Sequence, residues 1–141
     1  MNQMIRMQDM KRIFQAIALT GLLAVTAQPS MAADNYSDAM AQGKADATNP
    51  ATRAWYLNEM RPAFSRLVGP ALVECVGKTN YSMANGIGLV FSVSPTGEAK
   101  QIFWKAENNF TGCVGEKIKT LKFPASPVDE FYFGLEIGAA Q

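Results

Sequence analysis

The chain has no histidine among its 141 residues and only two cysteines, Cys75 and Cys113. Without histidine, Ser-His-Asp and Cys-His catalytic arrangements and histidine zinc sites are excluded. Two cysteines so far apart form no CxxC redox motif, and they supply too few thiolates for a metal site. We therefore predict that the protein is not an enzyme, with no catalytic residues, no cofactor and no metal ion.

The chain also lacks a large net charge of either sign, since it has 13 basic and 12 acidic side chains. Nucleic acids and anionic membranes attract clusters of Lys and Arg. The one local excess is Lys117, Lys119 and Lys122, which we interpret as a solvated helix face. Nucleic acid is therefore not expected as a partner.

The first 33 residues have the pattern of a bacterial secretory signal peptide. Basic Arg6, Lys11 and Arg12 precede the apolar run 13–27, and small residues then offer cleavage after Ala32 or Ala33. The run is short for a membrane span, although an uncleaved signal anchor is the alternative. We expect a periplasmic or secreted protein with no stable membrane span after cleavage.

Removal of this segment leaves residues 34–141, enough for one small domain. Residues 34–50 (DNYSDAMAQGKADATNP) are small and polar with no sustained period, which favours a flexible lead-in. The domain itself is then expected to span residues 51–141.

The first half of this domain has helical patterns interrupted by proline. Apolar residues at helical spacing predict a helix over residues 52–67, kinked at Pro62. Gly69 and Pro70 predict a break, and a short second helix is expected to end at Gly77.

The second half predicts three strands and one helix. Apolar residues alternate over 87–93, and a turn containing Pro95 and Gly97 leads to a second strand through Ile102 and Trp104. The apolar stripe of the following helix, which Pro124 ends, is Phe110, Val114, Ile118 and Leu121. Residues 131–137 alternate again as a final strand.

The expected order is helix, strand, strand, helix, strand, which belongs to the α+β class. Three antiparallel strands with one apolar face need helices on that face. The sequence therefore predicts a two-layer sandwich in which two helical regions pack on a small three-stranded antiparallel sheet.

Cys75 and Cys113 are interpreted first as a disulfide, because exported proteins fold in an oxidising compartment. Two buried unpaired thiols, or a reactive cysteine, are the alternatives. A bond would close a long loop and stabilise the fold by roughly 3–4 kcal/mol in the chain-entropy model.

The strand closed by VSPTG, the apolar residues near Ile102 and Trp104, the helix ending in LKFP and the last strand FYFGLEI resemble the C-terminal domain of TonB and its relatives. The resemblance covers residues 85–138. It implies a TonB-like fold and contact with other proteins. It does not imply energy transduction, because a true TonB keeps an uncleaved N-terminal helix and a long Pro-rich spacer.

These observations lead to a first hypothesis, an interaction module that binds a partner through an exposed sheet edge. The final strand is the expected edge, with Tyr132, Gly134 and Glu136 as contact residues and with Tyr132 and Glu136 on its outer face. The expected partner is another periplasmic or envelope protein, with a homodimer as a further possibility.

The alternative hypothesis is a secreted inhibitor of a hydrolase or a small-ligand-binding protein. Its site would lie in the loops 78–86 and 106–110. Trp55, Tyr56 and Trp104 either line a ligand groove or pack in and around the core.

Overall fold

The structure is a computed structural model that describes residues 32–138, so the expected signal peptide lies almost wholly outside the described residues. The elements are α1 (Tyr36–Thr48), α2 (Arg53–Trp55), the π-helical turn η1 (Tyr56–Met60), α3 (Arg61–Thr79), the 3-10 turn η2 (Met83–Asn85), β1 (Ile87–Val93), β2 (Ala99–Trp104), α4 (Asn109–Thr120) and β3 (Phe131–Ile137). The strands form one antiparallel sheet in the order β2-β1-β3. The α+β class is therefore confirmed. Over residues 32–138, no helix is both long and apolar enough to cross a membrane.

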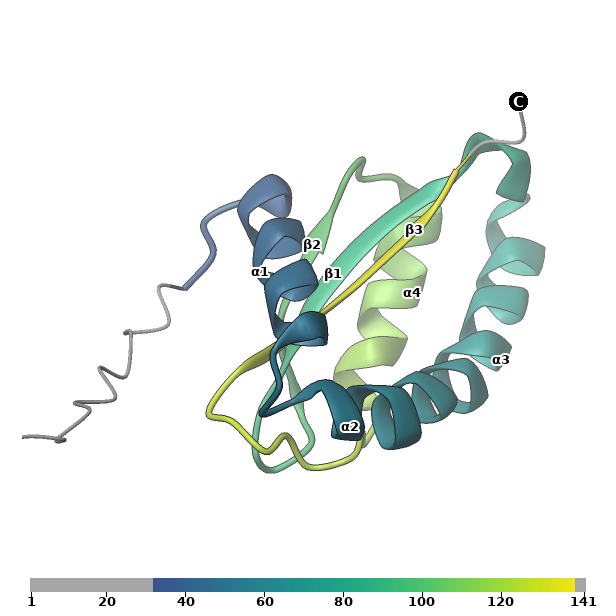
Figure 1. Ribbon diagram of the computed structural model, residues 1–141. Coiled ribbons are helices and arrows are strands. Elements are labelled where there is room, and N and C mark those ends of the chain that lie inside the picture. The colour runs from purple at the N-terminus through teal and green to yellow at the C-terminus, as the bar shows by residue number, and fades with distance from the viewer. Residues whose placement is uncertain (1–31, 139–141) are drawn as a thin grey trace, which may run out of the picture.

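The sheet has helices on both faces, with α3 and α4 on one side and α1 on the other (Figure 1). The predicted flexible lead-in at residues 34–50 contains a helix instead, and α1 adds a helix on the second face of the sheet to the two predicted helical regions. Asn35 caps α1 by accepting the Asp38 N–H at 3.0 Å. The buried residues of α1 that face the sheet are small, Ala39 and Gly43, and only Tyr36 and Met40 add larger, partly buried side chains. Two such residues are too few for the sustained spacing that predicts a helix.

β1 is the central strand, and all seven of its residues are buried. Ile87, Leu89, Phe91 and Val93 face the main core, as their alternation predicts. The opposite face carries Val90, which packs in a second, smaller cluster beneath α1. The prediction of a half-buried strand was thus right about the period and wrong about the second face.

α3 runs without interruption through Pro62 and Pro70. Pro62 closely follows the π-helical turn η1, which continues from α2 into α3. The predicted break at Gly69 and Pro70 is wrong, because buried residues of α3 lie on both sides of it and hold the helix against the core; they are Ala63, Phe64, Val68, Ala71 and Cys75. The helix ends at Asn80 in the left-handed conformation (φ 52°), beyond the expected end at Gly77.

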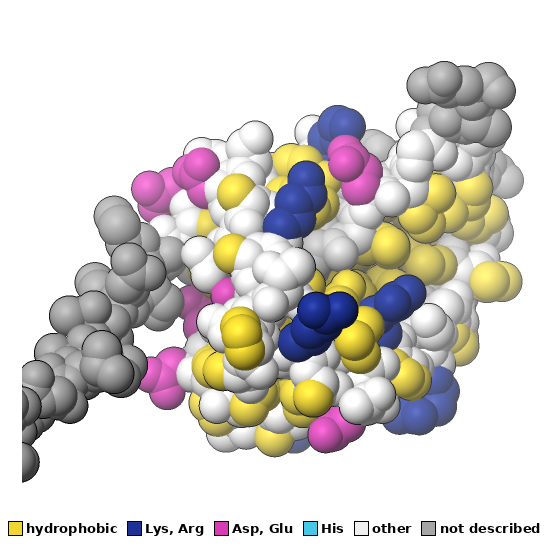
Figure 2. All heavy atoms as spheres, in the orientation of Figure 1, with side chains coloured by type: hydrophobic (Ala, Val, Ile, Leu, Met, Phe, Trp, Pro, Cys, Tyr) yellow, Lys and Arg dark blue, Asp and Glu magenta, His cyan; other side chains and the backbone are white. Residues whose placement is uncertain are grey.

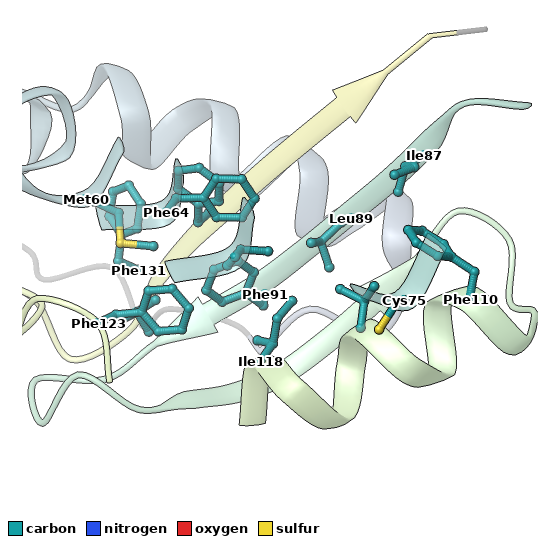
Figure 3. Close-up of a cluster of buried hydrophobic side chains, with 14 residues drawn as sticks. Met60, Phe64, Cys75, Ile87, Leu89, Phe91, Phe110, Ile118, Phe123 and Phe131 are labelled. Carbon is teal, nitrogen blue, oxygen red and sulfur yellow. The ribbon is translucent and has the colours of Figure 1, made fainter. Parts of the chain in front are cut away.

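The main core lies between the sheet and the α3–α4 layer, with aromatic rings at its centre (Figure 3). Phe91 lies 5.0 Å from Phe123 and 5.5 Å from Phe133, measured between ring centroids. The stripe predicted for α4 is correct for Phe110, Val114 and Ile118, which are fully buried, whereas Leu121 follows the end of the helix and is half-buried against the core. Each such side chain contributes about 1.5–3 kcal/mol by burial.

Cys75 and Cys113 form a disulfide between α3 and α4, with a Cα–Cα distance of 5.8 Å. This confirms the first interpretation of the two cysteines. Cys75 is fully buried in the main core. Beside the bond, Glu74 accepts hydrogen bonds from Lys117 and Lys78, which lower the pKa of its carboxyl to about 2.

The β1–β2 turn also fixes the segment that follows α4. Gly97 takes the positive φ (78°) that the sequence predicts, and its N–H donates to the Ser94 carbonyl at 2.8 Å. Its own carbonyl accepts the Phe123 N–H at 2.8 Å. Next to it, Glu98 and Lys122 form an isolated antiparallel bridge.

Candidate functional site

The sheet has two edges, β2 and β3, and its register shows which backbone groups each edge presents. The Lys105 N–H donates to the Gly88 carbonyl at 3.0 Å. Hydrogen-bonded and non-hydrogen-bonded pairs alternate in an antiparallel ladder. Ile102 and Trp104 of β2 therefore direct their N–H and C=O groups away from β1, because they pair with Phe91 and Leu89.

On β3, the same alternation directs the backbone groups of Tyr132, Gly134 and Glu136 outward. The Tyr132 N–H, however, already donates to Asp46 Oδ2 of α1 at 2.9 Å. Tyr132 is 1% exposed, so the prediction that it lies on an exposed outer face is wrong. Burial raises the pKa of the Asp46 carboxyl, against the opposing effect of the hydrogen bonds from Tyr132 and Gln42.

Gly134 and Glu136 differ in their surroundings. A Cβ at Gly134 would lie 2.8 Å from the Met40 sulfur, so α1 covers this position as well. Glu136 is exposed, and it pairs with Lys105 at 2.7 Å. This hydrogen bond lowers the pKa of Glu136. Of the three expected contact residues, the structure therefore leaves only Glu136 on an open surface.

Gly43 keeps α1 on the β3 edge, because a Cβ there would lie 3.1 Å from the Tyr132 carbonyl oxygen. We expect Gly43→Val to lift α1 and to destabilise the fold by about 1–3 kcal/mol. In hydrogen-exchange measurements the Tyr132 amide should then exchange faster than in the wild type. Ala41→Val, on the exposed side of α1, is the control. An unchanged Tyr132 amide in Gly43→Val would contradict the contact.

At the other edge, an open groove of about 370 Å³ runs between β2 and α4. We call it the β2–α4 groove; its lining includes Ile102, Trp104, Thr111, Gly112, Gly115 and Lys119. Ile102 and Trp104 are half-buried and pack against the main core, so their side chains form the floor. Gly112 and Gly115 make the α4 wall low, and a Cβ at Gly115 would lie 3.7 Å from the Trp104 indole nitrogen.

Three of the four charged side chains that line the β2–α4 groove form ion pairs, and the fourth, Glu107, forms none among residues 32–138. Lys119 binds Glu116 at 2.7 Å, and Lys100 binds Glu98 at 2.6 Å. The groove thus combines outward backbone groups, a floor of Ile102 and Trp104, and a lining with two Lys and two Glu side chains. Such a surface suits an extended polypeptide.

The two loops of the alternative hypothesis do meet in space. Tyr81 stacks on Phe110 with ring centroids 4.3 Å apart, and Asn108 caps α4 by accepting the Thr111 N–H. An open cleft of about 940 Å³ lies beside them; its lining includes Tyr81, Asn85, Lys105, Asn108, Thr111 and Glu136. Thr111 and Asn108 also border the β2–α4 groove, so the two hollows are neighbours.

Comparison with known proteins gives no information about this site. The chain matches no protein-family model, no curated protein and no solved structure. The chemistry of the site is therefore argued from its own residues.

The aromatic residues are divided between core and groove. Trp55 packs edge-on against Phe131 with ring centroids 4.9 Å apart, and Tyr56 lies against Phe131 and Phe133. Trp104, in contrast, lines the β2–α4 groove. Among residues 32–138, no cluster of three or more Cys, Asp and Glu side chains is arranged to hold a metal ion.

The residues that sequence reasoning missed are Gly112, Gly115 and Asp46. Glycine within a helix usually indicates only lower helix propensity, whereas Gly112 and Gly115 lower one wall of the groove. Asp46 lies 86 positions from Tyr132 in the sequence, so no local pattern connects the two residues.

Proposed function

We propose that this protein is a non-enzymatic, exported interaction module that binds an extended segment of another envelope protein as an added strand along β2. The observation that carries the proposal is the outward backbone of Ile102 and Trp104 beside the β2–α4 groove. Main-chain hydrogen bonds would supply affinity, and an apolar partner side chain over Trp104 would supply selectivity.

The two edges of the sheet are occupied to different extents. The bridge of Glu98 with Lys122 lies beside the start of β2 and before Ile102 and Trp104. The β3 edge, in contrast, has one outward N–H bound by Asp46. The chain itself therefore occupies part of β3 and leaves the later part of β2 beside an open groove.

Other observations are consistent with an exported, non-enzymatic role. The disulfide is compatible with an oxidising compartment such as the periplasm or the medium. The chain has no histidine, and its two cysteines are bonded to each other. The TonB-like interpretation of residues 85–138 remains part of the proposal, supported by the resemblance in the hairpin, the helix and the last strand.

The test fills the groove without disturbing the free protein. No atom lies within 4 Å of a Cβ built at Gly112 or at Gly77, so both positions accept a side chain. Gly112→Phe would occupy the β2–α4 groove, whereas Gly77→Phe on α3 is the matched control. For a partner isolated from envelope extract and then purified, we expect Gly112→Phe to weaken binding by about tenfold or more, the loss typical of a blocked central contact. Gly77→Phe should bind like the wild type.

Hydrogen exchange of the complex distinguishes the edges. Strand addition along β2 should slow exchange at the Ile102 and Trp104 amides. Protection at Gly134 and Glu136 instead would place the partner on β3 and overturn the proposal. Equal binding by folded Gly112→Phe would also overturn it, and light scattering would show whether the bound partner is a second copy of the chain.

The cleft beside Tyr81 supports a second candidate, a hydrolase inhibitor or small-ligand binder. The stacking of Tyr81 on Phe110 brings the two loops together and gives the cleft a firm wall. It ranks second because the Tyr81 hydroxyl already donates to the Gly86 carbonyl, and Asn108 is used in capping α4.

A further inference from the structure

The segment just before α1 is anchored on the sheet by one buried hydrogen bond. The Ala33 N–H donates to the Tyr132 hydroxyl at 3.2 Å. Ala33 is 9% exposed and Tyr132 is 1% exposed, whereas Ala32 and Asp34 are exposed. The contact to the sheet therefore begins at Ala33 and not at its neighbours.

The Tyr132 hydroxyl is oriented to accept at this point. Its own proton donates to Gln101 Oε1 of β2 at 2.8 Å, which leaves oxygen lone pairs for a donor from Ala33. Tyr132 of β3 thus connects Ala33, which lies shortly before α1, with Gln101 of β2 at the far edge of the sheet. Ala33, Ala39, Val90 and Tyr132 form the buried cluster beneath α1.

The two cleavage positions offered by the sequence have different consequences here. Hydrolysis of the Ala32–Ala33 peptide bond consumes one water, leaves a carboxylate on Ala32 and leaves an ammonium on the nitrogen that faces Tyr132. Hydrolysis after Ala33 would instead remove that nitrogen and the buried methyl group. Small residues at Ser30 and Ala32 fit the first position.

We infer that the exported chain begins at Ala33 and that its new α-amino group docks on the Tyr132 hydroxyl, fixing α1 to the sheet. The hydrogen bond from an ammonium is stronger than that from an amide, because the donor is charged. This inference rests on the signal-peptide interpretation and is independent of the β2–α4 groove.

The first experiment is the intact mass of the full chain after export from a bacterium. We expect a single species whose first residue is Ala33. A species that begins at Asp34, one alanine residue lighter, or at any other residue would overturn the inference, as would a chain that keeps its leader.

The second experiment measures docking of the amino group. Near neutral pH an amine-reactive label favours the α-amino group, whose ordinary pKa of about 7.7–8.0 lies below the value of about 10.4 for lysine. Tyr132→Phe should label roughly three- to tenfold faster than the wild type, as expected from the loss of one net hydrogen bond. Tyr81→Phe, which removes a hydroxyl bound to Gly86, is the control and should label at the wild-type rate. Equal rates for Tyr132→Phe and the wild type would overturn docking.

A third measurement covers the case in which Tyr132→Phe does not fold. Deleting Ala33 from the gene makes Asp34 the first residue after the same cleavage. The amides of α1 should then exchange faster with solvent than in the wild type. Unchanged exchange would show that Ala33 does not anchor α1 and would overturn the inference.

Discussion

Replacing both cysteines with alanine should lower the free energy of unfolding by about 3–4 kcal/mol, the largest effect expected for this protein. The bond closes a loop of 38 residues between α3 and α4, and a crosslink of that span restricts the unfolded chain by about this amount in the chain-entropy model. Small domains have only about 5–15 kcal/mol in total. Urea unfolding of Cys75→Ala/Cys113→Ala against the wild type measures the difference.

Reduced wild-type protein separates the crosslink from the sulfur atoms, because reduction breaks the bond and leaves the core volume intact. If the crosslink dominates, reduced wild type and the double variant should unfold at similar urea concentrations. A large loss in the variant alone would mean that the buried volume of Cys75 matters more. A change below about 1 kcal/mol in both would contradict the role of the disulfide, since that is the usual scale of a single substitution.

Gly97→Ala should cost about 2–4 kcal/mol, which is the second large effect. Gly97 has φ 78°, where an L-residue with a side chain pays about 1–2 kcal/mol. A Cβ there would also collide with the Phe123 carbonyl oxygen, so the hairpin or the segment after α4 must move. The cost should appear as a lower unfolding midpoint in urea, with an unchanged slope.

Gly112→Ala is the matched control, because it adds the same methyl group to a glycine with no atom within 4 Å of the new Cβ. Its position in α4 favours alanine, so we expect a gain of about 0.5–1 kcal/mol. Opposite signs at the two glycines would confirm that backbone conformation and contact decide the effect. Equal small effects at both would contradict the strain assigned to Gly97.

The candidate site was only partly predictable from the sequence. The strands 87–93 and 131–137 and the turn at Gly97 follow from alternation and turn chemistry, which act over a few neighbouring residues. The sequence pattern also led to the hypothesis of binding at a sheet edge, but it favoured β3. Asp46 of α1 binds the Tyr132 N–H of that strand, and this contact depends on a helix that the pattern did not predict.

The missed helix has a physical explanation. α1 meets the sheet mainly through Ala39 and Gly43, whose small size allows close approach, and only Tyr36 and Met40 add larger side chains. Hydrophobic periodicity detects sustained runs of large apolar residues, so a helix that packs mostly through small ones resembles a polar linker. The opposite error occurred at Pro70, where a helix break was predicted. The buried residues around Pro70 hold α3 together in spite of the lost hydrogen bond.

By itself, the sequence determined which side-chain chemistry is absent, where the three strands and the helix that carries Cys113 lie, and that the two cysteines can form a disulfide. Each of these depends on local pattern or on residue type. The tertiary structure alone decided that a third layer covers the second face of the sheet, that β2 is the edge beside an open groove, and that Ala33 meets Tyr132. Those features depend on contacts between residues far apart in the chain, and such contacts exist only once the strands have taken the order β2-β1-β3.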